Sequence, residues 1–461
     1  MTIWQPDPDA LHRPAYISLA DQFARAIADG QLHAGTQLQP QRKLAYDLGL
    51  SVQTVSRAYD ELIRRGLVVG EVGRGSFVLP PPGNNATPYL TERSSELIDL
   101  SILKPISDQS HIQIMRDGLS WVAEHLGAPA ALSFRPSSVL PRHRAIAAEW
   151  LRRGGIAAAP ESIVITDGAT SAITTAVMTA IPSGGALAAA ALTHHLLIPL
   201  CKYLGIHLEP LATDHDGILP DALDHAAQRG QAHAVFMQPS AISPRTTMMS
   251  ERRRLEIIDV ARRHDITIIE SDILNVLIQD RPAPLAALAP ERVLHISGFT
   301  KTTLPGLRLA YLSAPERLTA SAANRHLVTN WMATPVMVEL LSHWIEDSTI
   351  DKLIEWQRTA LAERHMLARQ MLAGANFRGH PQSLHLWLEL PEGRNEDQFV
   401  AQAMQRGVAI ASGRAFRIND RYRQDAVRIA LGPTHLAELR RGLQMITNLL
   451  KEEAEPLLPM I

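Results

Sequence analysis

The sequence predicts a multidomain α/β protein, and three observations support this fold class. A turn-rich segment interrupts the chain near residue 80. Before it, apolar residues recur at helical spacing and a short strand pair follows. After it, apolar strand-like runs alternate with helix-sized segments, a pattern typical of a parallel sheet with helices on both faces. The length of 461 residues suits about three folding units of roughly 100–200 residues each.

The interruption is a run of turn formers, Pro80-Pro81-Pro82-Gly83-Asn84-Asn85-Ala86-Thr87-Pro88. Proline lacks a backbone donor and glycine adds chain entropy, so this segment is not expected to fold on its own. We therefore expect a first domain over residues 1–79, a linker over 80–96 and a second domain over 97–461.

Composition and charge exclude several classes of protein. The chain has 45 basic and 47 acidic residues, so a net charge of −2 excludes nucleic-acid binding by bulk charge alone. Cys201 is the only cysteine, which excludes an intramolecular disulfide and a cysteine-based zinc site. The first residues lack the basic flank and apolar core of a signal peptide, and no uncharged apolar run of about 18 residues occurs. We expect a soluble cytoplasmic protein.

The first domain reads as three helices followed by a hairpin. The expected elements are helices at Ser18–Asp29 and Arg42–Leu48, a third helix capped by Ser51 and ended by Gly66, and strands over residues 67–69 and 76–79. The short second helix, a turn at Gly49 and the third helix form a helix–turn–helix. In such a motif the third helix enters the major groove of DNA with its N-terminus first.

Polar and basic side chains of this motif are candidates for DNA contact. Ser51, Gln53 and Thr54 lie in the first turn of the third helix, where short polar groups can bond base edges or phosphates. Phosphate contacts are expected from Arg42, Arg57 and Arg74, and close backbone approach at Gly75. The alternative is purely structural, because any three-helix domain contains such a turn. Residues 41–75 hold six basic and four acidic residues, whereas residues 1–80 hold eight of each.

The stretch from Ile17 to Val78 resembles the GntR-type winged helix–turn–helix. The resemblance rests on Leu-x-Pro-Gln-Arg-Lys-Leu-Ala, Gly-Leu-Ser-x-x-Thr-Val-x-Arg-Ala-Tyr and Gly-Arg-Gly-Ser-Phe-Val. It implies binding to a double-stranded DNA operator. Many such domains have an arginine where this chain has Val52, and that arginine often reads a base, so the operator sequence does not transfer.

The second domain holds three features that suit anion and amine chemistry. They are Thr166-Asp167-Gly168-Ala169-Thr170-Ser171, then Ser297-Gly298-Phe299-Thr300-Lys301 with Arg308, and Arg428 within an apolar strand. A strand-to-helix turn with glycine presents free N–H groups to a phosphate. A lysine among hydroxyls suits a Schiff base beside a phosphate-binding arginine. A buried arginine binds an anion, either a ligand carboxylate or a structural salt-bridge partner.

Together these features resemble a fold type I aminotransferase over roughly residues 97–450. With the first domain, the whole chain resembles a MocR-type regulator, in which an aminotransferase-like domain senses pyridoxal phosphate or an amino compound. The resemblance implies a homodimer. By this resemblance Lys301 is the Schiff-base lysine, Arg308 and the Gly168-Ala169-Thr170 turn hold the phosphate, and Arg428 holds an effector carboxylate.

The sequence departs from that family at the contacts to the cofactor ring. His194 replaces a stacking tyrosine, Ser243 replaces an asparagine, and Ser271 stands where a carboxylate normally holds the ring nitrogen. Leu274 replaces a second tyrosine. Asp272 is a candidate substitute for the carboxylate, although it points to the opposite side if the strand continues. Because Gly298 stands where a phosphate-binding hydroxyl is common, Ser297 and Thr300 are both candidates to replace it.

These losses predict weakened cofactor binding and little turnover. Each lost hydrogen bond to a charged group costs roughly 1.5–3 kcal/mol, and lost stacking about 0.5–1.5 kcal/mol. Without a carboxylate the ring nitrogen is not held protonated, so the cofactor is a poor electron sink. We therefore expect a transcriptional regulator that senses a small amino compound through pyridoxal phosphate on Lys301. The alternatives are a working aminotransferase with an accessory DNA-binding domain, and a regulator with a cofactor-free relic domain.

Adjacent histidines, His194 and His195, raise the question of a metal site. Side chains of neighbouring strand residues point in opposite directions, so both rarely bind one ion. We expect no metal there and a structural or ring-stacking role instead.

Overall fold

The computed structural model describes residues 4–29, 31–32, 36–64, 67–71, 75–78, 97–135, 140–422 and 424–452. The chain divides into two compact units, Met1–Ser94 and Ser95–Ile461. Arg74, Gly66 and the Pro80–Pro88 run lie outside the described residues. Each unit is described by itself below.

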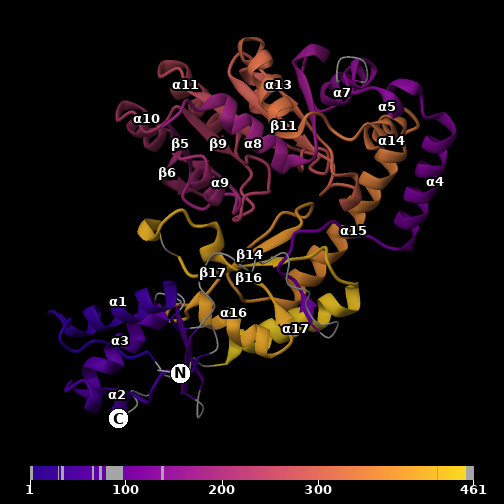
Figure 1. Cartoon of the computed structure of the whole chain (residues 1–461). Helices are drawn as coiled ribbons and strands as arrows, with labels where there is room; N and C mark the ends of the chain where they lie inside the picture. Colours follow the sequence, from indigo (N-terminus) through magenta and orange to yellow (C-terminus); the bar gives the residue numbers. More distant parts are fainter. Residues whose placement is uncertain are drawn as a thin grey trace. The chain divides into compact units, whose positions relative to one another are not determined.

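The first unit has the three helices and the hairpin that the sequence predicts (Figure 1). The elements are α1 (Ala15–Ala28), α2 (Gln41–Asp47), α3 (Val52–Arg64), β1 (Val68–Glu71) and β2 (Gly75–Val78). The two strands pair antiparallel, with Val68 opposite Val78. The predicted bounds are confirmed to within three residues at each described helix end.

Apolar faces of α1 and α3 hold this unit together. Leu19 and Phe23 of α1 are buried in one core with Val55 and Tyr59 of α3. The Tyr59 hydroxyl donates to the Gln39 carbonyl over 2.8 Å, which fixes α3 against the segment before α2. The helix–turn–helix therefore has a defined geometry.

The second unit is built on a seven-stranded sheet with the order β4-β12-β11-β10-β9-β5-β6. Its strands are β4 (Ile163–Thr166), β5 (Ala186–Ala190), β6 (His207–Leu211), β9 (Ala234–Met237), β10 (Thr267–Ser271), β11 (Val293–Gly298) and β12 (Ala310–Ser313). The predicted parallel pairing is found among β6, β5, β9, β10 and β11, whereas β12 pairs antiparallel with both β11 and β4. Only residues 299–309 separate β11 from β12, so no crossover helix brings the chain back to a parallel start.

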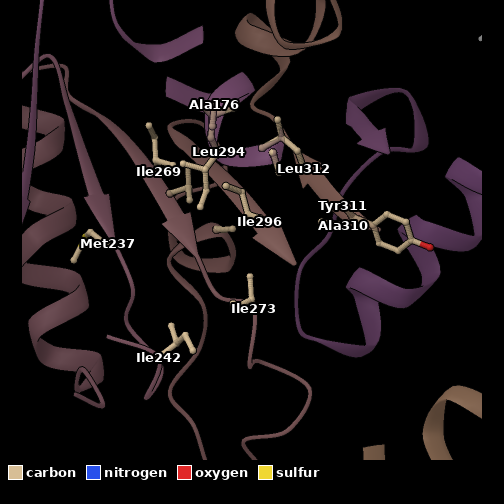
Figure 2. Close-up of a cluster of buried hydrophobic side chains, with 14 of the residues drawn as sticks. Ala176, Met237, Ile242, Ile269, Ile273, Leu294, Ile296, Ala310, Tyr311 and Leu312 are labelled. Atoms are coloured by element: carbon tan, nitrogen blue, oxygen red, sulfur yellow. The ribbon is translucent and has the colours of Figure 1, made fainter. Parts of the chain in front are cut away.

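Helices cover both faces of this sheet. Helix α8 (Ala169–Ala180) packs on one face, where Ile269 and Leu294 lie near its Ala176, while Tyr311 points away from this cluster (Figure 2). On the other face, α12 (Leu285–Leu288) follows a turn where the buried Glu270 accepts from its first backbone N–H over 2.8 Å. The remaining helices of the large lobe are α4 (Gln109–His125), α5 (Ala128–Leu132), α7 (Pro141–Arg153), α9 (Leu197–Tyr203), α10 (Pro220–Gln228), α11 (Glu251–Arg263), α13 (Glu316–Asn330) and α14 (Pro335–Glu346).

A smaller α+β lobe follows, which the apolar runs at His385–Leu390 and Ala426–Ala430 predict from the sequence. Its antiparallel sheet has the order β13 (Phe377–Arg378), β14 (His385–Glu389), β17 (Ala426–Ala430), β16 (Ala411–Ser412). Helices α15 (Thr349–Met371), α16 (Glu396–Gln405) and α17 (Leu436–Lys451) accompany it (Figure 1). The start of the unit joins this lobe, because β3 (Ile98–Asp99) pairs parallel with β15 (Val408–Ala409).

Short elements complete the described chain. They are the hairpin β7 (Thr213–Asp214) and β8 (Gly217–Ile218), and the 3₁₀ turns η1 (Pro160–Ser162), η2 (Pro305–Leu307), η3 (Gly413–Phe416) and η4 (Asp420–Tyr422). Within the described residues, no helix has the length and apolar content needed to cross a membrane.

Candidate functional site

The start of α8 and the end of β11 form a candidate phosphate site. Gly168, the residue before α8, has a φ of +90°, and no side chain caps the helix. A Cβ added to Gly168 would lie 3.2 Å from a terminal nitrogen of Arg308, so the guanidinium lies directly against this turn. The sequence-predicted Gly168, Ala169 and Arg308 are thus brought together, and a free helix N-terminus beside an arginine suits a phosphate.

Thr300 adds a second feature to this site. Its hydroxyl oxygen is buried and has no hydrogen-bond partner among the described residues. Such an atom carries a desolvation cost unless a ligand bonds it. Gly298 has no side chain to offer, and Ile273 and Ala169 occupy the space where its Cβ would lie. The Thr300 hydroxyl therefore remains open to a ligand contact, whereas the Ser297 hydroxyl accepts from the Asn275 amide over 3.4 Å.

A pocket beside Lys301 collects side chains from both lobes. Its lining contains two cations, Lys301 and Arg428, and three imidazoles, His194, His195 and His385. Among the described residues, no aspartate or glutamate belongs to this lining. We call it the histidine pocket.

The electrostatics of the pocket favour a reactive lysine. Burial, followed by the nearby positive charges of Arg428 and Arg308, lowers the pKa of Lys301 to about 8. A larger fraction of the amine is then neutral at physiological pH than for an exposed lysine, and the neutral amine is the nucleophile that forms a Schiff base.

The two adjacent histidines share this pocket, and their expected divergence is wrong. His194 and His195 follow β5 in a loop, where strand alternation does not apply, and their ring centroids are 4.8 Å apart. Burial, then the neighbouring His195, lowers the pKa of His194 well below its usual value. Burial and the charge of Arg428 lower the pKa of His195 to about 3.

Arg428 reaches the pocket from the centre of β17, as predicted. It is 6% exposed, one terminal nitrogen donates to the Ser101 carbonyl over 2.6 Å, and its guanidinium carbon lies 4.6 Å from the ring centroid of Phe416. Aromatic stacking and a carbonyl contact orient the guanidinium at the pocket. The group is therefore suited to bind a carboxylate.

Two predicted cofactor contacts lie outside the histidine pocket. Asp272 is fully buried and pairs with Arg281 over 3.4 Å, on the Glu270 side of the strand. Burial raises the pKa of Asp272 despite this partner. The hydroxyl of Ser243 accepts from the backbone N–H of Thr247 over 3.0 Å and lines a neighbouring pocket. Ser271 is two residues after Ile269 in β10, so strand alternation places its side chain on the same face of the sheet as that of Ile269.

His385 is a pocket residue that sequence reasoning missed. It begins β14 and is fully buried. The sequence shows only a histidine at the start of an apolar strand, and its proximity to Lys301 arises from the packing of the two lobes. Ser101, whose carbonyl holds Arg428, carried no signal at all.

The candidate DNA-reading residues lie on the first unit. Arg42, Gln53 and Arg57 are exposed, at the start of α2 and on α3. The Ser51 hydroxyl accepts from the Thr54 backbone N–H over 3.0 Å and lies 2.8 Å from the Thr54 hydroxyl, so both residues also build the start of α3. Gly75 is exposed with a φ of +113°.

Comparison with protein families identifies both parts of the chain. Residues 15–78 match the family of bacterial regulatory proteins of the gntR type, and residues 96–446 match aminotransferase class I and II. The second match covers most of the chain. The chain belongs to the aminotransferase class I and II family. The fused gntR-type domain confirms the MocR-type architecture that the sequence indicates.

Two proteins named as regulators match most of this chain. An uncharacterized HTH-type transcriptional regulator, YdeF of Bacillus subtilis, is 26% identical, and the match covers 97% of each chain. The probable rhizopine catabolism regulatory protein MocR of Rhizobium meliloti is also 26% identical, over 87% of this chain and 84% of that one.

Solved aminotransferases share the fold of the second unit. A kynurenine aminotransferase from Pyrococcus horikoshii has a TM-score of 0.71 at 19% identity, with 80% of this chain and 98% of that chain covered. The predicted fold type I architecture is confirmed. Membership of this family implies pyridoxal-phosphate chemistry in general.

Proposed function

We propose that this protein is a DNA-binding transcriptional regulator whose aminotransferase-like unit senses a small amino compound, with pyridoxal phosphate held at Lys301. The gntR-type domain and the regulator relatives support an operator as the partner of the first unit. The proposal includes action in the cytoplasm and assembly as a homodimer. It also keeps the domain limits of 1–79 and 97–461, joined by the linker over 80–96.

The residues at the candidate phosphate site fit the cofactor. Arg308, the α8 N-terminus and the Thr300 hydroxyl would hold its phosphate, Lys301 its aldehyde carbon, and His194 one ring face. When bound, the cofactor supplies an electrophilic carbon that captures amines. Arg428 would orient an amino compound by its carboxylate.

The observation that carries the sensor proposal is the absence of any carboxylate from the described lining of the histidine pocket. A transaminase needs a group that keeps the ring nitrogen protonated. Ser271 stands at that position by resemblance, and Asp272 lies outside the pocket lining, with one carboxylate oxygen 3.4 Å from Arg281 and the other without a hydrogen-bond partner among the described residues. The structure thus favours ligand capture over turnover, and this weighs against the aminotransferase alternative.

A spectroscopic titration tests the cofactor part of the proposal. Pyridoxal phosphate added to the full-length protein should give a visible absorbance band. Reduction with borohydride should then attach the cofactor covalently to the peptide that contains Lys301, where mass spectrometry detects it. Lys301→Ala should abolish both signals, whereas Lys202→Ala, on α9 outside the pocket lining, should retain them. An unchanged wild-type spectrum would support the cofactor-free alternative.

A binding assay tests the DNA part. Labelled random duplexes are selected on the full-length protein, and the enriched duplex is then measured against an unselected one. The proposal expects at least a thousandfold preference for the enriched duplex at physiological salt. Failure to enrich any duplex would refute the regulator assignment.

A further inference from the structure

Val52 is an exposed apolar side chain at the start of α3. It is 45% exposed, and its neighbours Ser51 and Gln53 are exposed as well. The side of α3 that faces the core is filled by other residues, since Val55 is fully buried and Tyr59 is 1% exposed. Val52 therefore adds little to the core of the first unit and presents its isopropyl group outward.

The side chain of Val52 is held in a defined position. The Ser51 hydroxyl lies 2.8 Å from the Thr54 hydroxyl and accepts from the Thr54 backbone N–H over 3.0 Å, which fixes the first turn of the helix. Valine also has one strongly preferred rotamer in a helix. A side chain that is already ordered loses little conformational entropy when it contacts a partner.

The same turn suits the approach of a duplex. Its residues 52–55 include no acid, and a helix N-terminus carries a partial positive charge, so DNA phosphates are not repelled there. A recognition helix enters the major groove with its N-terminal residues against the base edges. As the first residue of α3, Val52 then faces a base edge.

The chemistry of valine limits which base feature it can recognise. Its side chain has no donor or acceptor, so it cannot bond the nitrogen and oxygen atoms of the base edges. Thymine alone among the four bases presents a methyl group in the major groove. Contact between that methyl group and an isopropyl group removes apolar surface of both from water, which is favourable.

We propose that Val52 reads thymine at one base pair of each operator half-site by contacting the C5 methyl group. This inference rests on the proposed function, since it names a specificity-determining residue of the same DNA interface. The alternative is a valine without a role, because single exposed apolar residues are common on protein surfaces. The two differ in whether the thymine methyl group contributes to binding through Val52.

The test removes only that methyl group. The duplex enriched on the full-length protein is rebuilt with deoxyuridine in place of each thymine in turn, a change that keeps base pairing and the O4 acceptor. At one position of each half-site, the affinity of the wild type should fall about fourfold, the value of one buried methyl group. Val52→Ala should bind the two duplexes equally at that position. This variant should fold, because the side chain is exposed and alanine favours a helix.

Two further variants assign the effect to this residue. Ile63→Ala is the matched control, because Ile63 is 44% exposed near the other end of α3, and it should keep the wild-type sensitivity to deoxyuridine. Val52→Arg, taken through a new selection, should enrich guanine in place of thymine at that base pair, because arginine bonds guanine O6 and N7.

Three results would overturn the proposal. They are a wild type that is insensitive to deoxyuridine at every thymine, a Val52→Ala variant that keeps the full sensitivity, and selection of a base other than guanine by Val52→Arg. Failure of the proposed function would show instead as failure to enrich any duplex on the wild type.

Discussion

At the scale of single residues, Lys301 is the group whose state is most sensitive to its surroundings. Its pKa of about 8 comes from burial and from the nearby Arg428 and Arg308. A substitution that removes one of these charges should therefore raise that pKa. The sequence alone places Lys301 directly after a strand. That Arg428, from a strand far along the chain, lies close enough to lower the pKa of Lys301 is seen only in the folded structure.

The first prediction concerns the pH dependence of cofactor attachment. Only the neutral amine reacts, so the rate of band formation should rise about tenfold per pH unit below pH 8 and level off above it. Arg428→Met should move this midpoint upward. Stopped-flow absorbance between pH 6.5 and 9.5 measures it, and a midpoint near 10.5 in the wild type would contradict the described environment.

The second prediction concerns acid stability through His385. Its folded-state pKa of about 3 lies below the unfolded value of about 6.5, so the neutral ring stabilises the fold fully above pH 6.5. That contribution is lost progressively as the pH falls from 6.5 toward 3. The loss reaches about 2 kcal/mol at pH 5. Urea unfolding at pH 7 and pH 5 measures it on the full-length protein.

Variants assign that loss to the buried ring. His385→Gln should lose about 2 kcal/mol less than the wild type between the two pH values. His215→Gln changes an exposed histidine and should keep the wild-type difference. An unchanged difference in His385→Gln would show that the pKa of the ring is nearly the same in the folded and unfolded states, which contradicts the prediction.

At the scale of elements, most strands with mainly apolar sequence are predictable. The runs Ala234–Met237 and Ala426–Ala430 predict strands from the sequence, and strands form over the same residues. His207–Leu211 was missed because it contains His, Glu and Pro, which an edge strand tolerates. Ala310–Ser313 was missed because it follows Arg308 with only one residue between them.

The third prediction concerns the start of the recognition helix. Ser51 caps α3 through the Thr54 backbone N–H, so Ser51→Ala should cost about 1 kcal/mol of stability in the first unit. Ser56→Ala, within the same helix, is the matched control and should change stability by less than about half of that. Thermal unfolding of the full-length protein measures both, and equal losses would contradict the capping role.

The fourth prediction separates base reading from phosphate contact on α3. Gln53→Ala should relax preference at one base pair by roughly 1–3 kcal/mol. Arg57→Ala should weaken all sequences alike and lower the salt slope by about one. Arg25→Ala, exposed on α1, should change neither quantity. Binding titrations of each variant with DNA at several salt concentrations measure both quantities. An unaltered dependence of affinity on salt in Arg57→Ala would show that Arg57 does not contact the DNA.

At the scale of the whole molecule, the protein joins a gntR-type DNA-binding unit to an aminotransferase-like unit whose expected contacts to the cofactor ring are altered. The architecture follows from sequence because both motif sets are local and ordered along the chain. The composition of the histidine pocket does not follow from the sequence, because the pocket forms only when the two lobes pack and bring together His194, His385 and Arg428. The central claim is that this pocket captures amino compounds without sustained transamination.

The fifth prediction is a multiple-turnover assay of the cofactor-loaded full-length protein with paired amino donors and keto acids. The account predicts that donors change the visible spectrum while new keto acid stays at or below one equivalent per site. Ser271→Asp, which restores a carboxylate at the ring-nitrogen position, should raise any residual rate. Steady turnover of the wild type at about 1 s⁻¹ or faster, within the ordinary range of enzymes, would contradict the sensor assignment.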